Sequence, residues 1–231
     1  MASGLARLSR QITACRRCPE LRAYCAEVAH EKRRAYRDHA YWGKPVPGFG
    51  DPAARILLVG LAPGAHGSNR TGRMFTGDAS GTWLYRALHK AELASQPVAT
   101  DRDDGLHLID TFISAAGRCA PPKNKLTPQQ IANCRPWLAR EFELLPNVRV
   151  VLGIGAVGFK AAADLLVAEG YALDPQRPKF AHGGQARARR GERELTLLAT
   201  YHVSQQNTST GVLTEAMLDA ILAQAKKLAQ T

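Results

Sequence analysis

A glycine-rich segment of nineteen residues, Gly60 to Asp78, follows directly on an apolar run at residues 56–59 and constrains the fold most. The apolar run is typical of a buried strand, whereas a segment with five glycines cannot pack as core. Glycines let backbone N–H groups approach a ligand at the carboxyl end of a strand. We therefore expect a binding loop here, with Gly60, Ala62 and Gly64 on the ligand.

The composition predicts a single domain over residues 1–231. The chain is 45% hydrophobic, and no stretch approaches the eighteen consecutive apolar residues of a membrane span. Arginines at positions 7, 10, 16 and 17 occupy the N-terminus in place of the apolar stretch of a signal peptide, so we expect a cytoplasmic protein without a membrane partner. Thirty-one Lys and Arg against twenty Asp and Glu give a net charge of +11, which favours a polyanionic partner.

Strand-like and helix-like patterns alternate along the chain. We expect strands at residues 56–59, 108–113, 148–152 and 195–200, and helices from Asp78, over 127–145, over 156–169 and from 213 to the C-terminus. Such alternation predicts a three-layer α/β/α fold whose central, mostly parallel sheet has four strands. The loops after these four strands should converge on one site.

Cysteines form a second pattern. Cys15 and Cys18 are a C-x-x-C pair, Cys119 and Cys134 are separated by fourteen residues, and Cys25 is left over. Four thiolates can hold a tetrahedral zinc ion or a 4Fe-4S cluster, and unrelated buried cysteines are the alternative. Spacing alone does not choose between iron and zinc.

Four stretches carry a resemblance to a known family: GLAPGAHGSNRTGRMFTGD from Gly60, WGKPVPGFGD from Trp42, RCAPPKNK from Arg118 and YHVSQQNT from Tyr201. Together they resemble the prokaryotic family 5 uracil-DNA glycosylases, and the resemblance spans most of the chain. It implies a monomeric α/β/α enzyme that removes uracil from DNA in base excision repair. It also implies a structural 4Fe-4S cluster on Cys15, Cys18, Cys119 and Cys134, with Cys25 free.

The resemblance also implies roles for site residues. Phe75 would stack on the flipped base, and His202 would hydrogen-bond the uracil O2 as negative charge gathers there. Asp78 would position water or stabilise the sugar cation, although its position also suits an N-cap for the following helix. Asn124 would line the pocket or sit in a turn.

The polar loop after His202 should enter the minor groove. Val203, Ser204 and Gln205 would fill the space left by the flipped nucleotide.

Ala115 is a departure from the superfamily pattern. Many members read the uracil edge with an Asn at the end of the second strand, where this chain has Ser114-Ala115-Ala116. Without that amide, discrimination by hydrogen bonding should weaken, so we expect other deaminated bases such as hypoxanthine to be released.

Two other functions compete with this interpretation. The run Gly153-Ile154-Gly155-Ala156-Val157-Gly158 is a literal G-x-G-x-x-G, which taken alone would indicate a dinucleotide-dependent oxidoreductase. The acidic residue that should end a second strand about twenty residues later falls in Leu173-Asp174-Pro175, which we expect not to be a strand end. The other alternative is an iron-sulfur or zinc nucleic-acid-binding module without catalysis. The basic stretches at residues 182–193 and 32–42 are either solvated surface or DNA contacts.

Overall fold

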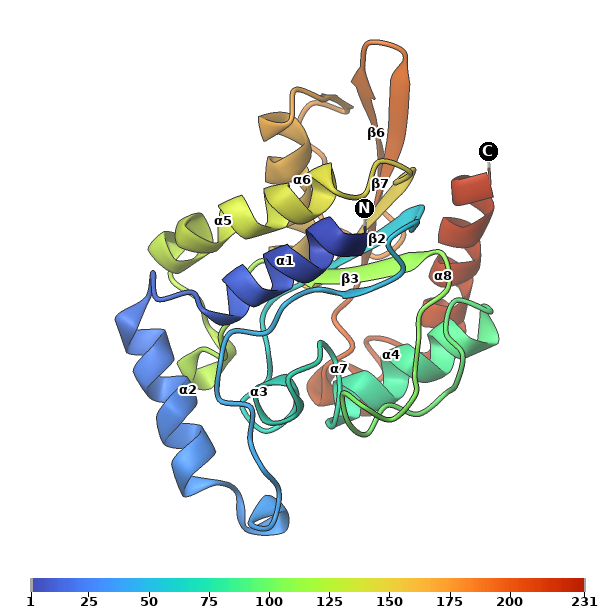
Figure 1. The fold of residues 1–231 in the computed structure, drawn as a ribbon. Coiled ribbons are helices and arrows are strands. Elements are labelled where there is room, and N and C mark those ends of the chain that lie inside the picture. The colour runs from blue at the N-terminus through green and yellow to red at the C-terminus, as the bar shows by residue number, and fades with distance from the viewer. Residues whose placement is uncertain (1, 231) are drawn as a thin grey trace.

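The computed structural model describes residues 2–230 and has three layers around one sheet (Figure 1). The strand order is β1-β3-β2-β4-β7-β6-β5. Its centre is parallel and consists of β3 (Thr111–Ala115), β2 (Ile56–Gly60), β4 (Val150–Ile154) and β7 (Arg193–Thr200). The predicted α/β/α class and the parallel centre are confirmed.

The sheet has seven strands, so the prediction of four was wrong. The three additional strands, β1 (Phe49–Gly50), β5 (Ala172–Asp174) and β6 (Gln185–Arg190), all pair antiparallel at the edges. In β6, buried Ala186 and Ala188 alternate with exposed arginines. This period of two is a strand signal, but alanine is a poor strand former and the arginines made the segment resemble a solvated loop.

Helices cover both faces of the sheet (Figure 1). One layer contains α1 (Ala2–Thr13), α5 (Pro128–Glu143) and α6 (Gly155–Ala168), and the other contains α4 (Ala79–Lys90) and α8 (Glu215–Gln230). α2 (Pro19–Glu31) extends away from the sheet beyond the end of α1. Short helical turns fill the loops: η1 (Arg34–Tyr36), α3 (Ser68–Thr71), η2 (Pro122–Asn124) and α7 (Gln205–Ser209).

Two apolar cores follow from this layering. Leu58, Ile113 and Leu152 point to the α4 and α8 side, and Leu57, Val59 and Val151 point to the α5 and α6 side. Adjacent residues of one strand face opposite layers, and both faces are buried, which explains why the central strands are continuous apolar runs. Within residues 2–230, no helix combines the length and the apolar character needed to cross a membrane.

The G-x-G-x-x-G run joins β4 to α6 by close packing. A side chain on Gly158 would overlap with the carbonyl group of Val59, and one on Gly153 would overlap with the backbone of Phe159. The glycines therefore let α6 approach the sheet. Asp174 does end a short strand, contrary to expectation, but that strand pairs only with β6 and lies at the sheet edge, so it does not complete a dinucleotide site beside β4.

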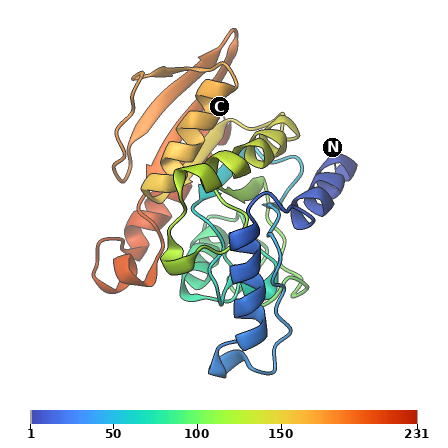
Figure 2. The same cartoon turned by 90° about the vertical axis from the view of Figure 1, so that its left-hand side faces the viewer.

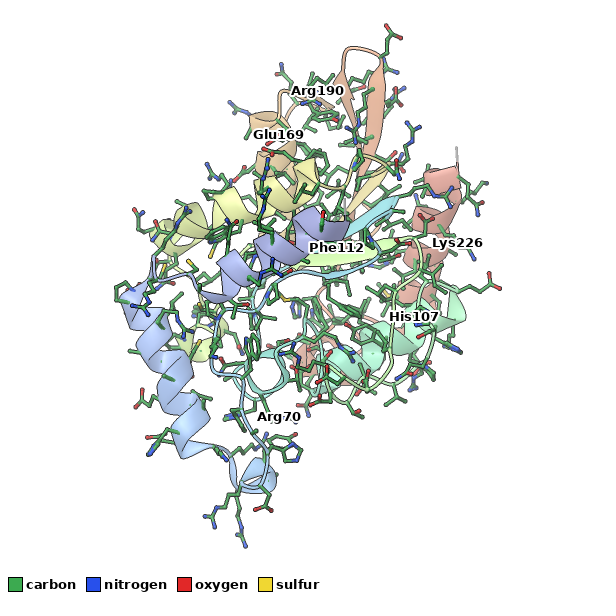
Figure 3. The ribbon with its side chains drawn as sticks, viewed as in Figure 1. Arg70, His107, Phe112, Glu169, Arg190 and Lys226 are labelled. Carbon is green, nitrogen blue, oxygen red and sulfur yellow. The ribbon has the colours of Figure 1, made fainter. Side chains whose placement is uncertain are left out.

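The β6–β7 hairpin projects from one end of the molecule, and α2 lies at the opposite end (Figure 2). The arginines of the β6–β7 hairpin contact other groups of the protein. Arg190 donates to the carbonyl of Glu169 at 2.7 Å, and Arg189 pairs with Glu194 at 2.6 Å. Figure 3 shows Arg190 and Glu169 together at this end, with Arg70 of α3 at the other. This placement favours solvated surface over DNA contact for residues 182–193.

Candidate active site

A cavity of about 620 Å³ lies at the carboxyl ends of the parallel strands. Nearly all the predicted site residues line it: Ala62, Gly64, Phe75, Asp78, Ala115, Asn124, His202, Ser204 and Gln205. These residues come from the loops after β2, β3 and β7. The loop after β4 contributes no lining residue, but Gly155 packs under His202, where a Cβ would lie 3.0 Å from the His202 Cβ. Three of the four loops therefore converge as predicted.

Gly60 lies beneath the cavity instead of lining it. A Cβ there would lie 2.8 Å from Cζ of Phe75, so the missing side chain makes room for the Phe75 ring. The ring is half-buried against the core, and its backbone has a φ of +50°, which a non-glycine residue adopts only when its surroundings hold it. Phe75 is thus fixed as part of the cavity wall.

Asp78 has two contacts that place its carboxylate. Oδ1 accepts a hydrogen bond from the backbone N–H of Gly81 at 3.0 Å, so the N-cap of α4 is confirmed. Oδ2 packs against the backbone of Gly64 and Gly67, where a Cβ on Gly64 would lie 2.9 Å from it. Burial raises the pKa of Asp78, and this rise is opposed by backbone N–H groups of Gly81 and Ser80 and by the charge of Arg70.

His202 stands opposite Phe75, with ring centroids 6.4 Å apart and an interplanar angle of 37°. Burial lowers the pKa of His202, because removing water disfavours the imidazolium. The side-chain amide of Asn207 donates to the His202 carbonyl at 2.9 Å and fixes the backbone here. The cavity therefore presents a neutral imidazole facing an aromatic ring.

At the end of β3, the side chains of Ser114 and Ala115 point in different directions. The hydroxyl of Ser114 donates to Oε2 of Glu141 at 2.6 Å and accepts from Arg118 at 2.8 Å, in a fully buried network. Ser114 is thereby turned away from the cavity, and the neighbouring Ala115 lines it with a methyl group. No side-chain amide replaces the missing Asn at this point of β3.

Asn124 reaches the cavity from η2. Lys123 and Asn124 both have left-handed backbone, with φ of +54° and +55°, so Asn124 is in a turn as well as on the cavity wall. Asparagine tolerates this conformation better than most residues, and lysine does not.

The loop after His202 differs from expectation at Val203. Its side chain is completely buried in the core and therefore cannot enter DNA, so this part of the prediction was wrong. The physical reason is that the chain turns into α7 here, with the hydroxyl of Ser204 accepting from Asn207 N–H as the N-cap. Gln205 and its neighbour Gln206 are exposed at the cavity edge.

His66 is a cavity residue that the sequence reasoning missed. Its Nδ1 lies 3.1 Å from the Tyr41 hydroxyl, and burial together with Arg33 and Arg70 lowers the pKa of His66. Arg70 is also held by an aromatic residue, because its guanidinium lies 4.0 Å from the Tyr36 ring centroid. The position of His66 inside the glycine-rich segment could have indicated a cavity residue. Its contact with Tyr41, and that of Arg70 with Tyr36, arise only in the tertiary structure.

The five cysteines are all free thiols, and three of them share a small apolar cluster below the α2 helix: Cys18, Cys25 and Cys119. Burial raises the pKa of Cys18 and of Cys134, and in both cases the Cys119 thiol adds to the rise. Cys15 contributes in the same way to Cys18. Cys18 therefore lies within electrostatic range of the other three predicted ligands, although among residues 2–230 no three His, Cys, Asp or Glu side chains are arranged closely enough to hold a metal ion as they stand.

Taken together, fold and cavity define a three-layer α/β protein with a buried acid, a neutral histidine and an aromatic wall at the ends of its parallel strands. The sequence model of the uracil DNA glycosylase superfamily matches residues 47–226. Type-5 uracil-DNA glycosylase of Thermus thermophilus is 51% identical over 94% of this chain and 95% of its own length. The type-5 uracil-DNA glycosylase of Mycobacterium bovis is 47% identical over 99% of this chain and 83% of its own length. The type-5 uracil-DNA glycosylase of Pyrobaculum aerophilum is 41% identical over 91% of this chain and 87% of its own length. This chain belongs to the type-5 family of the uracil-DNA glycosylase superfamily.

Proposed function

We propose that this protein flips uracil out of DNA and hydrolyses its N-glycosidic bond, leaving an abasic site for base excision repair. One observation carries the proposal: Phe75, Asp78 and His202 line one cavity of about 620 Å³ in a chain of this family. That size is within the range of small-ligand pockets. A base inside a duplex is inaccessible, so a cavity must receive it after extrusion.

Stacking on Phe75 would hold the extruded base. Its ring is fixed from below by the space over Gly60 and stands 6.4 Å from the His202 ring. Backbone N–H groups of the segment that contains Ala62 and Gly64 would contact the base, because this segment lines the same cavity. Asn124 would contact the base or the adjoining backbone from the opposite loop.

Charge separation during bond cleavage determines the roles of Asp78 and His202. Negative charge develops on the departing base, where the N–H of a neutral imidazole can donate a hydrogen bond. Positive charge develops on the sugar, where the Asp78 carboxylate would stabilise it or orient the attacking water. The raised pKa of Asp78 and the lowered pKa of His202 are both consequences of the water-poor cavity in which these interactions are strongest.

Substrate breadth follows from Ala115. A methyl group offers neither a donor nor an acceptor to the Watson-Crick edge, so a wrong base leaves no buried polar group unpaired at this point. The proposal therefore includes hypoxanthine, and lesions in mispairs or single strands should be preferred because they cost less to flip. Ser204 and Gln205, at the edge of the cavity, would support the emptied position of the helix.

Cys15, Cys18, Cys119 and Cys134 would hold a 4Fe-4S cluster. The surroundings fit an anionic thiolate cluster. The amide of Asn133 donates to the Cys18 sulfur at 3.3 Å. The buried Arg118 guanidinium opposes the rise that burial causes in the pKa of Cys134, and its Nε and one terminal nitrogen have no hydrogen-bond partner. When bound, the cluster would supply structure and no reaction step, because four thiolates leave no coordination position for substrate.

We propose that the enzyme acts as a monomer, as the family resemblance implies, and in the cytoplasm, the compartment that offers both DNA and reduced thiols. The experiment is incubation of a labelled oligonucleotide containing uracil with the purified protein and no added cofactor, followed by hot alkali. Strand cleavage at the uracil position supports the glycosylase. DNA binding without cleavage would instead indicate the nucleic-acid-binding module, and neither DNA binding nor cleavage would favour the oxidoreductase.

A further inference from the structure

A second cavity, of about 560 Å³, lies outside the active site, between the end of α1 and residues 42–47. Its wall carries five basic side chains: Arg10, Arg16, Arg22, Lys44 and Arg102. No Asp or Glu is among its lining residues. We call this cavity the basic groove.

Three of the five cations of the basic groove are available to an external ligand, whereas Arg22 also contacts the Cys119 thiol and Arg102 reaches Asp103. Within residues 2–230, Arg10, Arg16 and Lys44 make no ion pair, and Arg22 makes none either but donates to the carbonyl of Gly43 at 3.1 Å. Arg102 has only a long contact with Asp103, at 3.7 Å. On β6, by contrast, Arg187 and Arg189 both face acidic partners. Like charges around one cavity repel one another, and a bound anion relieves that repulsion.

Trp42 organises the groove. The Arg102 guanidinium lies 4.6 Å from the Trp42 ring centroid and the Lys44 ammonium lies 5.5 Å from it. The indole N–H donates to the carbonyl of Pro45 at 3.2 Å, which fixes the ring. Because the ring already carries these two cations, the groove presents positive charge, and its ligand is a phosphate chain in preference to a stacked base.

The groove adjoins the active site through α3. The N–H of Trp42 donates to the carbonyl of Arg70 at 2.8 Å, and Gly43 N–H donates to that of Asn69 at 3.0 Å. Ser68, the first residue of the same helical turn, lines the active-site cavity. Four helical residues span only about 6 Å, so the groove and the active-site cavity flank the same short buried turn. Duplex DNA carries a charge every ~1.7 Å along its axis. A duplex that places one nucleotide in the active-site cavity therefore offers further phosphates to the groove.

We infer that the basic groove binds the sugar-phosphate backbone of the DNA substrate beside the flipped nucleotide, independently of sequence. The inference rests on the proposed glycosylase function only for the identity of the DNA. Its residues differ from those of the active-site cavity, so the two can be tested separately.

The test measures binding of a labelled 30-base-pair duplex, with a tetrahydrofuran abasic analogue opposite guanine, by fluorescence anisotropy from 50 to 200 mM KCl. The groove variant is Arg10→Gln/Arg16→Gln/Lys44→Gln. The control variant, Arg177→Gln/Arg187→Gln/Arg189→Gln, removes the same three charges from exposed positions at the other end of the protein. A third variant, Arg10→Lys/Arg16→Lys/Lys44→Arg, keeps the charges and checks that the local fold is intact.

We expect the slope of log K against log salt to fall by about two to three in the groove variant, and affinity at 0.1 M salt to fall on the order of 10²-fold. The control and the charge-conserving variants should stay near the parent. Equal losses in the groove and control variants would show an effect of net charge alone and overturn the inference, as would a loss in the charge-conserving variant or no loss in any.

A free phosphate ligand would give a different result. Inorganic phosphate would then raise the melting temperature of the parent but not of the groove variant, with DNA affinity unchanged, and this also overturns the backbone assignment. Failure of the glycosylase proposal is recognised independently, because it would appear as an absence of uracil excision by the parent protein.

Discussion

Gly67 and Asp78 are so close that a side chain on Gly67 would overlap with Oδ2 of the carboxylate. The first prediction uses this contact. Gly67→Ala should move the Asp78 side chain and lower the single-turnover rate of uracil excision on the order of 10²-fold, as Asp78→Ala should, since that is the usual scale for one group of this kind. DNA affinity should change little.

The control is Gly183→Ala, whose Cβ would meet nothing within 4 Å. Its φ of +75° strains an alanine locally, but the residue lies outside the cavity, so uracil should be excised at the parental rate. If Gly67→Ala displaces the carboxylate and still excises uracil at the parental rate, Asp78 is only the N-cap of α4. A parental rate in Asp78→Ala would lead to the same conclusion.

The second prediction is an acid limb in the rate profile. In the proposed reaction Asp78 acts as a carboxylate, and its raised pKa means that this form is lost on acidification at a higher pH than for an ordinary Asp. In the same proposal His202 acts as a neutral imidazole, and its lowered pKa means that it stays neutral until a lower pH than an ordinary His. The single-turnover rate should therefore be flat near neutrality and fall between about pH 6.5 and 4, the ordinary values of the two groups.

His202→Ala should lose on the order of 10² in rate and keep the part of the limb that Asp78 causes. DNA binding measured at each pH is the control. A rate that rises on acidification over this range would contradict both assignments.

Ala115→Asn is the third prediction. The amide would restore a donor and an acceptor at the end of β3, so the ratio of uracil to hypoxanthine excision rates should rise by at least about tenfold. The measurement compares single-turnover rates on the two bases opposite the same partner. Preference for uracil above about 10⁴ in the parent, the level that hydrogen-bond readout reaches, would mean that another residue reads the base edge.

A fourth prediction concerns the buried pair of Arg118 and Glu141, whose nitrogen and oxygen are 2.6 Å apart and whose side chains are 1% and 2% exposed. Glu141→Ala would leave the Arg118 charge buried without a counterion and should destabilise the fold by about 3–5 kcal/mol. Urea unfolding measures this loss. The exposed pair of Lys160 and Asp164 is the comparison, because Lys160→Ala should cost less than about 1 kcal/mol. Similar losses for the two variants would contradict the prediction.

The fifth prediction distinguishes the cysteines. The purified protein should be brown, with an absorbance band near ~400 nm and about four irons per chain, as thiolate-ligated clusters give. Cys119→Ala should lose iron and misfold. Cys25→Ala should keep both iron and colour, because Cys25 lies in the same apolar cluster without being one of the four ligands. Stoichiometric zinc without iron would contradict the prediction.

The central strands and the place of the site could be predicted from the sequence because both depend on local patterns. A strand buried on both faces must be apolar throughout, as residues 56–59 are, and a glycine-rich segment after it must lie at the carboxyl edge of the sheet. That rule brought together Asp78, Asn124 and His202, which are far apart in the chain.

Tertiary structure alone decided what depends on neighbours distant in sequence. The antiparallel strand β6 forms because β7 offers it a partner and buries Ala186 and Ala188, a stabilisation that no local propensity of the segment provides. Val203 is taken out of the DNA-facing loop by packing into the core. The contact of His66 with Tyr41, and the gathering of basic side chains around Trp42, likewise arise where separate segments meet. The sequence thus determined which residues can do the chemistry, and packing between distant segments determined their partners and exposure, since burial and hydrogen bonding are properties of assembled surroundings.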